Sequence, residues 1–241
     1  MDGVVSIDGN EQEWQGHLTP LGKEKITLGL RNDETYLYVS FLVNDRVRQM
    51  QIMAQGMTVW FDPSGGKEKT FGVRFPVGLR GGGSFGTRIL LDSPEEREAQ
   101  VAAAMRELEL VFAEGKSTRY PVDGLPGVEV AADFARGGVV YELKIPLQVT
   151  GAFPYAVGAA PGTLVGIGFE TPEVDREAMR AQMGERSGGG GIGGGDFGGR
   201  GGGMGPAGSG GFPGGDGPGV RGGQRPDPLK VWTRVQLAGG N

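Results

Sequence analysis

The chain has 241 residues, of which 49 are glycine and none is cysteine, and its formal net charge is −5 with a single histidine, His17. The lack of cysteine excludes disulfides, thiol catalysis and thiolate metal sites, and one histidine excludes a multi-histidine metal centre. An acidic chain argues against a general nucleic-acid binder. No run of about 18 apolar residues is present that could cross a membrane as a helix.

Alternating apolar and polar residues predict an all-β domain. The clearest signal is the stretch 26–45, where two alternating runs flank a polar break at 32–35, as in a β-hairpin with one buried face. A proline at position 76 favours an edge or bulged strand over a central one for residues 70–79. In chain order the strands are expected at 4–8, 26–31, 36–43, 57–61, 70–79, 87–92, 108–112, 128–132, 139–145, 163–169 and 228–237.

Two helices are predicted from their start signals. Ser93 can cap, Pro94 suits the first turn and Glu96 completes a capping box, so a helix is expected to run to about Arg106. A second short helix is expected to begin at 171–173 and to end near 184. Residues 47–55 have no clean period, which leaves a helical turn and an irregular edge both open.

Glycine supplies more than half of residues 187–225, and apolar residues are scattered singly there. Such a segment loses much backbone entropy on ordering and has little apolar surface to offset the loss, which predicts a flexible loop. Alternation returns at 228–237, as expected for a last strand of the same domain. The predicted organisation is therefore a β-sandwich over 1–186, a glycine-rich insertion loop over 187–227, and a final strand within 228–241 that completes the sandwich.

Four stretches together resemble the β-sandwiches of the family 9 carbohydrate-binding-module and DOMON-like group. They are Val5-Ser6-Ile7-Asp8-Gly9 with Glu13-Trp14, the hairpin from Leu30 to Tyr38, Val59-Trp60-Phe61-Asp62-Pro63, and the segment from Val140 to Leu147. The resemblance covers residues 4–170 and the last strand. It implies a two-sheet antiparallel sandwich of jelly-roll or immunoglobulin-like type. It also implies an extracytoplasmic location, with a leader absent from this numbering, and non-catalytic binding of sugars or, in another branch, haem.

The sugar-binding branch of that group clamps a glycan end between two tryptophans, and Trp60 and Trp232 are the pair that could do so here. An outward Trp60 ring could stack on a sugar while Asp62 accepts hydrogen bonds from its hydroxyls. The structural alternative for Trp60 is packing of the sheet face under the helix at 94–106. Trp14 is expected to cap the open end of the sandwich, and haem is disfavoured because His17 stands alone as a possible axial ligand.

No cofactor is predicted. Asp33, Asp45 and Asp62 lie in turns, where aspartates usually cap their own backbone. Calcium is possible there but has no supporting loop spacing. No nucleophile with a neighbouring base and no carboxylate pair stands out, which favours a protein that is not an enzyme.

The first functional hypothesis is a non-enzymatic extracytoplasmic β-sandwich that binds a glycan or a similar cell-surface ligand through Trp60, Asp62 and Trp232. The alternative is a structural subunit of an extracellular assembly or filament, in which the glycine-rich tract and the sheet edges make the subunit contacts. Neither hypothesis includes a nucleic-acid partner or a transmembrane segment.

Overall fold

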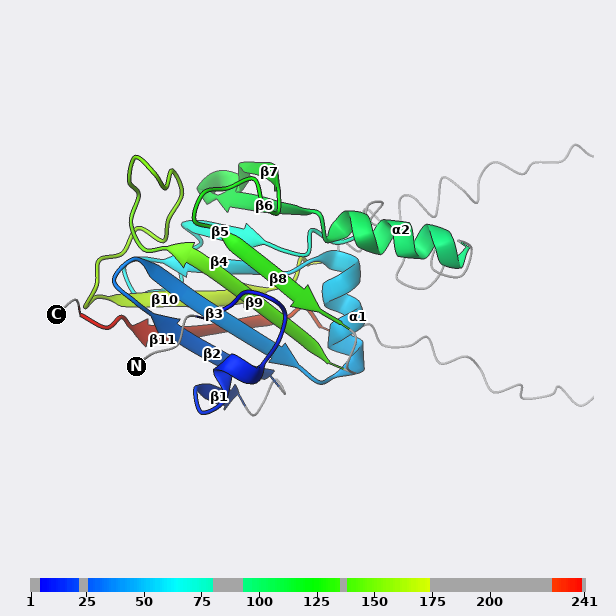
Figure 1. The fold of residues 1–241 in the computed structure, drawn as a ribbon, viewed down its shortest axis with the longest axis horizontal. Helices are drawn as coiled ribbons and strands as arrows, with labels where there is room; N and C mark the ends of the chain where they lie inside the picture. Colours follow the sequence, from blue (N-terminus) through cyan, green and yellow to red (C-terminus); the bar gives the residue numbers. More distant parts are fainter. Residues whose placement is uncertain (1–4, 22–25, 80–92, 135–137, 174–226, 240–241) are drawn as a thin grey trace, which may run out of the picture. The chain divides into compact units, whose positions relative to one another are not determined.

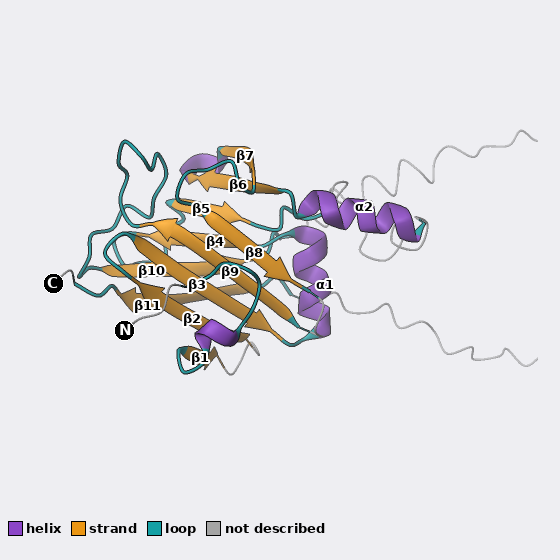
Figure 2. Cartoon of the chain, in the orientation of Figure 1, coloured by secondary structure: helices purple, strands orange, loops and turns teal. Residues whose placement is uncertain are grey.

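Two antiparallel sheets pack face to face in the computed structural model, which describes residues 5–21, 26–79, 93–134, 138–173 and 227–239 (Figure 1). One sheet has five strands in the order β1-β2-β3-β9-β8, and the other has six in the order β11-β10-β4-β5-β6-β7. The predicted all-β sandwich is therefore confirmed, and the view coloured by secondary structure shows strands in both layers with few helices (Figure 2).

The strands and helices have the following bounds, in chain order. The strands are β1 Leu18–Leu21, β2 Ile26–Asn32, β3 Tyr36–Val43, β4 Thr58–Asp62, β5 Phe71–Arg74, β6 Glu107–Phe112, β7 Ser117–Pro121, β8 Glu129–Asp133, β9 Val139–Pro146, β10 Leu164–Glu170 and β11 Lys230–Gln236. The helices are α1 Arg46–Gln55 and α2 Pro94–Ala104, with short 3-10 turns at Gln12–Trp14 and Ala113–Gly115.

The core lies between the two sheets because alternate residues of each strand point inward. On β3 the inward set includes Val39 and Phe41, and on β10 it includes Ile167 and Phe169, and all four side chains have no exposed area. Phe41 and Phe169 stack across the interior with ring centroids 4.9 Å apart. The hairpin pattern of the sequence thus marked the buried face correctly.

Several strand predictions need correction. Residues 5–8 form no strand, and β1 and β7 were not predicted. β5 is an interior strand between β4 and β6, so the expected edge position is wrong. The reason is that β5 ends at Arg74, before Pro76 could remove a ladder hydrogen bond. The predicted strand at 87–92 lies outside the described residues.

Both helices begin at residues whose side chains cap backbone amides. The Ser93 side chain accepts from the Glu96 amide, and the Glu96 side chain accepts from the Ser93 amide, which confirms the capping box of α2. Residues 47–55, left open by their pattern, lie in α1, which begins at Arg46 because Asp45 Oδ1 accepts from the first helical amides at 3.0 Å. No helix forms at 171–173, and the rest of that predicted helix lies outside the described residues.

The last strand belongs to the same sandwich, since β11 pairs with β10 along its whole length. Just beyond the pair, the Thr171 amide donates to the Leu229 carbonyl at 3.1 Å, and the Leu229 amide donates to Thr171 Oγ1 at 2.9 Å. Gln51 of α1 donates to the same hydroxyl at 3.1 Å. The glycine-rich tract itself lies outside the described residues, so the division at 187 and 227 stays a prediction.

Candidate ligand-binding face

Trp60 and Trp232 lie on one face of the six-stranded sheet, the outer face that points away from the core. The strand register places Gly168 of β10 opposite Trp60 of β4 on one side and opposite Trp232 of β11 on the other. Neighbouring strands are about 4.8 Å apart, so the two tryptophan backbones are about 10 Å apart across the sheet. The structure therefore brings together two aromatic residues that are far apart in the sequence.

Glycines beneath the rings let both indoles lie against the sheet. A Cβ atom placed on Gly168 would stand 2.5 Å from Cε2 of Trp232, and one on Gly72 of β5 would stand 2.8 Å from Cε3 of Trp60. Any larger residue at either position would have to displace the ring. The two indoles consequently rest on backbone, each over the strand next to its own, and form parts of a single outer surface.

Lys69 and Glu170 connect the two tryptophans electrostatically. Trp232 Nε1 donates to Glu170 Oε1 at 3.2 Å, and the other oxygen of Glu170 forms an ion pair with Lys69. The Lys69 ammonium also stands 5.5 Å from the centre of the Trp60 ring, within cation–π range. Sequence reasoning missed both residues, since Lys69 lies in a loop and Glu170 at a strand end with no motif around them.

The two tryptophans differ in exposure. Trp60 is only 9% exposed, whereas Trp232 is half-buried and the Lys69 side chain is 47% exposed. Lys69 thus covers part of the Trp60 ring, and Trp232 offers the more open surface. Gly72 and Lys69 both lie near the Trp60 ring, and the structural alternative of packing under α2 stays a prediction.

Asp62 is buried at the end of β4, and its carboxylate holds the turn that follows. Oδ1 accepts from the backbone amide of Ser64 at 2.9 Å and from the Ser64 hydroxyl, and Oδ2 accepts from the Glu68 amide at 2.8 Å. Burial opposes ionisation, but these hydrogen bonds outweigh it and hold the pKa of Asp62 below its usual value. Both oxygens are engaged inside the turn, so Asp62 is better placed to shape the loop carrying Lys69 than to accept bonds from a ligand.

Trp14 is structural, although it covers a sheet face and not the open end that was expected. Its ring is fully buried against Gly29 on the outer side of the five-stranded sheet. Its Nε1 donates to Glu142 Oε1 at 2.6 Å, while Glu142 Oε2 accepts from the amides of Asp8 and Gly9 at 3.0 and 2.6 Å. One buried carboxylate therefore links two of the four sequence stretches that carried the family resemblance.

The other turn aspartates cap backbone amides as predicted. Asp33 Oδ1 accepts from the amides of Thr35 and Tyr36, both at 2.7 Å, and Asp45 caps α1. Within the described ranges, no group of three or more histidine, cysteine, aspartate or glutamate side chains could hold a metal ion. The same ranges contain no helix with the length and apolar character needed to cross a membrane.

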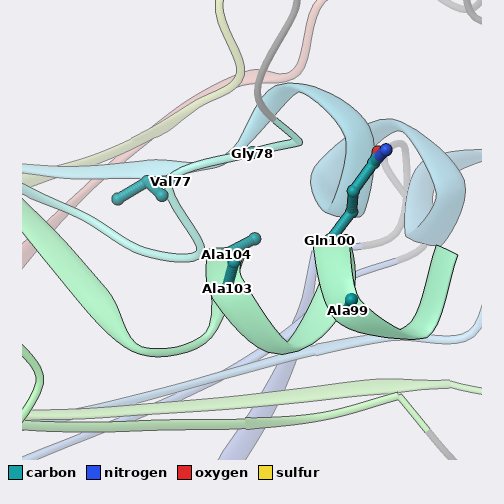
Figure 3. Close-up of a pocket in the computed structure, with 6 residues that line it drawn as sticks. All are labelled: Val77, Gly78, Ala99, Gln100, Ala103 and Ala104. Carbon is teal, nitrogen blue, oxygen red and sulfur yellow. The ribbon is translucent and has the colours of Figure 1, made fainter. Parts of the chain in front are cut away.

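A pocket of about 210 Å³ lies elsewhere, between α2 and the segment after β5 (Figure 3). It is lined by Val77, Gly78, Ala99, Gln100, Ala103 and Ala104. None of these side chains is an acid, a base or a nucleophile, so the lining supplies no group for general acid–base or covalent catalysis. The pocket is apolar and separate from the tryptophan face, which is the outer face of the six-stranded sheet that carries Trp60 and Trp232.

Comparison with known proteins is sparse. No family model and no curated protein matches the chain. Two solved structures that resemble it are of a family 9 carbohydrate-binding module from Caldicellulosiruptor kristjanssonii, one in complex with glucose and one with cellotriose. Each is 15% identical with a TM-score of 0.34, and the matches cover 73% of this chain and 78% and 76% of theirs. A likeness this distant identifies no ligand, and membership of the family 9 and DOMON-like group stays a prediction.

Proposed function

We propose that this protein is a non-enzymatic, extracytoplasmic carbohydrate-binding β-sandwich whose ligand lies on the outer face of the six-stranded sheet. The observation that carries the proposal is the alignment of Trp60 and Trp232 across Gly168. Tryptophan offers a large flat apolar face with a polar N–H at its edge, which suits the C–H face of a sugar ring flanked by hydroxyls.

The arrangement favours an elongated ligand over a single sugar. Both indoles lie against the sheet and do not face each other, so they form a platform instead of a clamp. Two platforms about 10 Å apart can each stack one sugar of a short oligosaccharide that crosses the strands. Lys69 lies between them, and its ammonium has three donors, of which one is paired with Glu170, so it offers donors to sugar hydroxyls.

Ligand stacking on Trp60 requires Lys69 to move, because the ammonium occupies the outward side of that ring. The Lys69 side chain is long and 47% exposed, so it can rotate at little cost. Trp232 needs no such change. We therefore assign Trp232 the larger share of the binding energy and Trp60 the smaller.

The test is a glycan array followed by calorimetry on the oligosaccharides that bind. Trp232→Ala is expected to weaken binding at least tenfold, equivalent to about 1.4 kcal/mol, and Trp60→Ala to weaken it less. Tyr36→Ala is the matched control, because Tyr36 also lies beneath a lysine, Lys144 at 4.5 Å, but on the other sheet.

Absence of any glycan binding, or loss of binding in Tyr36→Ala but not in Trp232→Ala, would contradict the proposed site. The alternative role as a subunit of an extracellular assembly has a separate readout. Sedimentation of the full chain and of a chain lacking residues 187–227 would support that role only if the full chain assembles and the shortened chain does not.

A further inference from the structure

Two cations flank Trp232 on the same outer face. Lys230 and Arg234 lie two residues before and after Trp232 on β11, so all three side chains point to the same side of the sheet. Each is about 6.6 Å along the strand from Trp232. Both are exposed, and neither side chain forms an ion pair or a hydrogen bond with any residue that the structure describes, although the strand register sets Lys230 opposite Glu170.

The acids of this face, in contrast, are already engaged. Glu170 is held by Lys69 and Trp232. Glu109 is paired with Arg74 at 3.4 Å and with Arg119 at 3.7 Å. Across the described part of the face, the charges left open next to the Trp232 indole are therefore positive, although the whole chain carries a net charge of −5.

From this geometry we infer that the tryptophan face binds acidic polysaccharides, in which sugars carry carboxylate or sulfate groups. This inference rests on the proposed carbohydrate-binding function and names the substrate class of the same site. A sugar ring stacks on Trp232, and its acidic substituents, or those of the next sugar, meet Lys230 or Arg234. The arginine can bind a carboxylate or sulfate through two parallel hydrogen bonds, and the lysine acts as a point charge.

A paired set of ligands isolates the contribution of charge. Polygalacturonate and its methyl ester share one backbone, and only the first carries free carboxylates, while dextran sulfate and dextran form the corresponding sulfate pair. We expect the protein to bind at least one acidic member about tenfold more tightly than its neutral counterpart at low ionic strength. We also expect that preference to shrink as salt is raised, since both cations are exposed.

Variants locate the effect at the tryptophan face. The double substitution Lys230→Gln and Arg234→Gln is expected to reduce affinity for the acidic ligand about tenfold and to leave affinity for the neutral one unchanged. Arg106→Gln is the control, because Arg106 is exposed and immediately precedes β6, which lies four strands from β11, or about 19 Å across the sheet. Its substitution removes a positive charge of the same type from a distant position.

The outcomes separate this inference from the function on which it rests. Equal affinity for acidic and neutral ligands, or an equal loss in Arg106→Gln and the double variant, would overturn the acidic preference while the protein remained a glycan binder. Failure to bind any glycan would remove the proposed function itself. Equally tight binding of single-stranded DNA or of anionic vesicles would show general attraction to polyanions and would also overturn the inference.

Discussion

The contact between Gly168 and Trp232 provides a quantitative test of the tryptophan face. Changing Gly168 to alanine adds one Cβ atom that would meet three atoms of the Trp232 ring at 2.5, 2.6 and 2.8 Å. These distances are below normal contact and involve a rigid ring, so the indole must lift from β10. The hydrogen bond from Trp232 Nε1 to Glu170 would be lost in the same movement.

The expected cost follows from area and hydrogen bonding. Lifting the ring exposes about a third of the ~200 Å² that a tryptophan buries, which is worth about 1.7 kcal/mol. The hydrogen bond adds about 1 kcal/mol, so Gly168→Ala should lower the free energy of unfolding by about 2.7 kcal/mol. Urea denaturation followed by circular dichroism measures this change, and Gly151→Ala is a matched control because an added Cβ there meets nothing within 4 Å.

A double-mutant cycle identifies the cause. In a Trp232→Ala background the clash disappears, so Gly168→Ala should then cost less than about 0.5 kcal/mol. The Gly168→Ala variant should also lose glycan affinity to the extent that Trp232→Ala does, since the indole no longer lies flat against the sheet. A stability cost that is the same in both backgrounds would refute the steric explanation and would point to the strand backbone instead.

Three further predictions concern stability. Asp62→Asn should lower the free energy of unfolding by about 2 kcal/mol at neutral pH. Because the folded-state pKa of Asp62 is lowered, its contribution to stability is present above the unfolded pKa and is lost as pH falls through the folded pKa. Measured as a function of pH, the free energy of unfolding of the variant should therefore lack this acid-dependent component. Glu142→Gln should destabilise the fold by about 2 kcal/mol, because the amide places an N–H group against a donor. Limited proteolysis should then release the segment around Trp14, and resistance equal to that of the parent chain would contradict the anchoring role of Glu142. Replacing residues 174–226 with a two-residue Asn-Gly turn should keep the fold and raise the free energy of unfolding by about 2 kcal/mol, since a shorter loop closes at lower entropic cost. Loss of cooperative unfolding in this variant would show that the sandwich needs the replaced segment.

The pH behaviour of Glu142 has the opposite sign to that of Asp62. Burial raises the pKa of Glu142, and the three hydrogen bonds from Trp14, Gly9 and Asp8 offset this only in part. The contribution of Glu142 is therefore full below its unfolded pKa and declines as pH rises through the folded pKa. The two carboxylates can be distinguished by the direction in which stability changes with pH.

Local pattern was sufficient for most of the strands and for the helix caps. Alternation identified β2, β3, β6, β9 and β10 because one set of alternate side chains on each strand packs into the core. Capping residues identified α2, since Ser93 and Glu96 satisfy backbone groups within their own turn. The pattern failed at β1 and β7, which are short edge strands with little burial, so the sequence carries almost no apolar signal there.

The candidate face also combines features that the local sequence determines with features that only tertiary structure determines. The sequence by itself placed Trp232 opposite the apolar side of its strand, because side chains alternate along a strand. For the Trp60-Phe61 pair it determined only that one side chain faces inward and the other outward, and the structure turns Trp60 outward. Tertiary structure alone decided that they share a row across Gly168, that glycines form the floor beneath the rings, and that Lys69 and Glu170 join them. The physical reason is that strand order and register arise from pairing between distant segments, which no local pattern encodes.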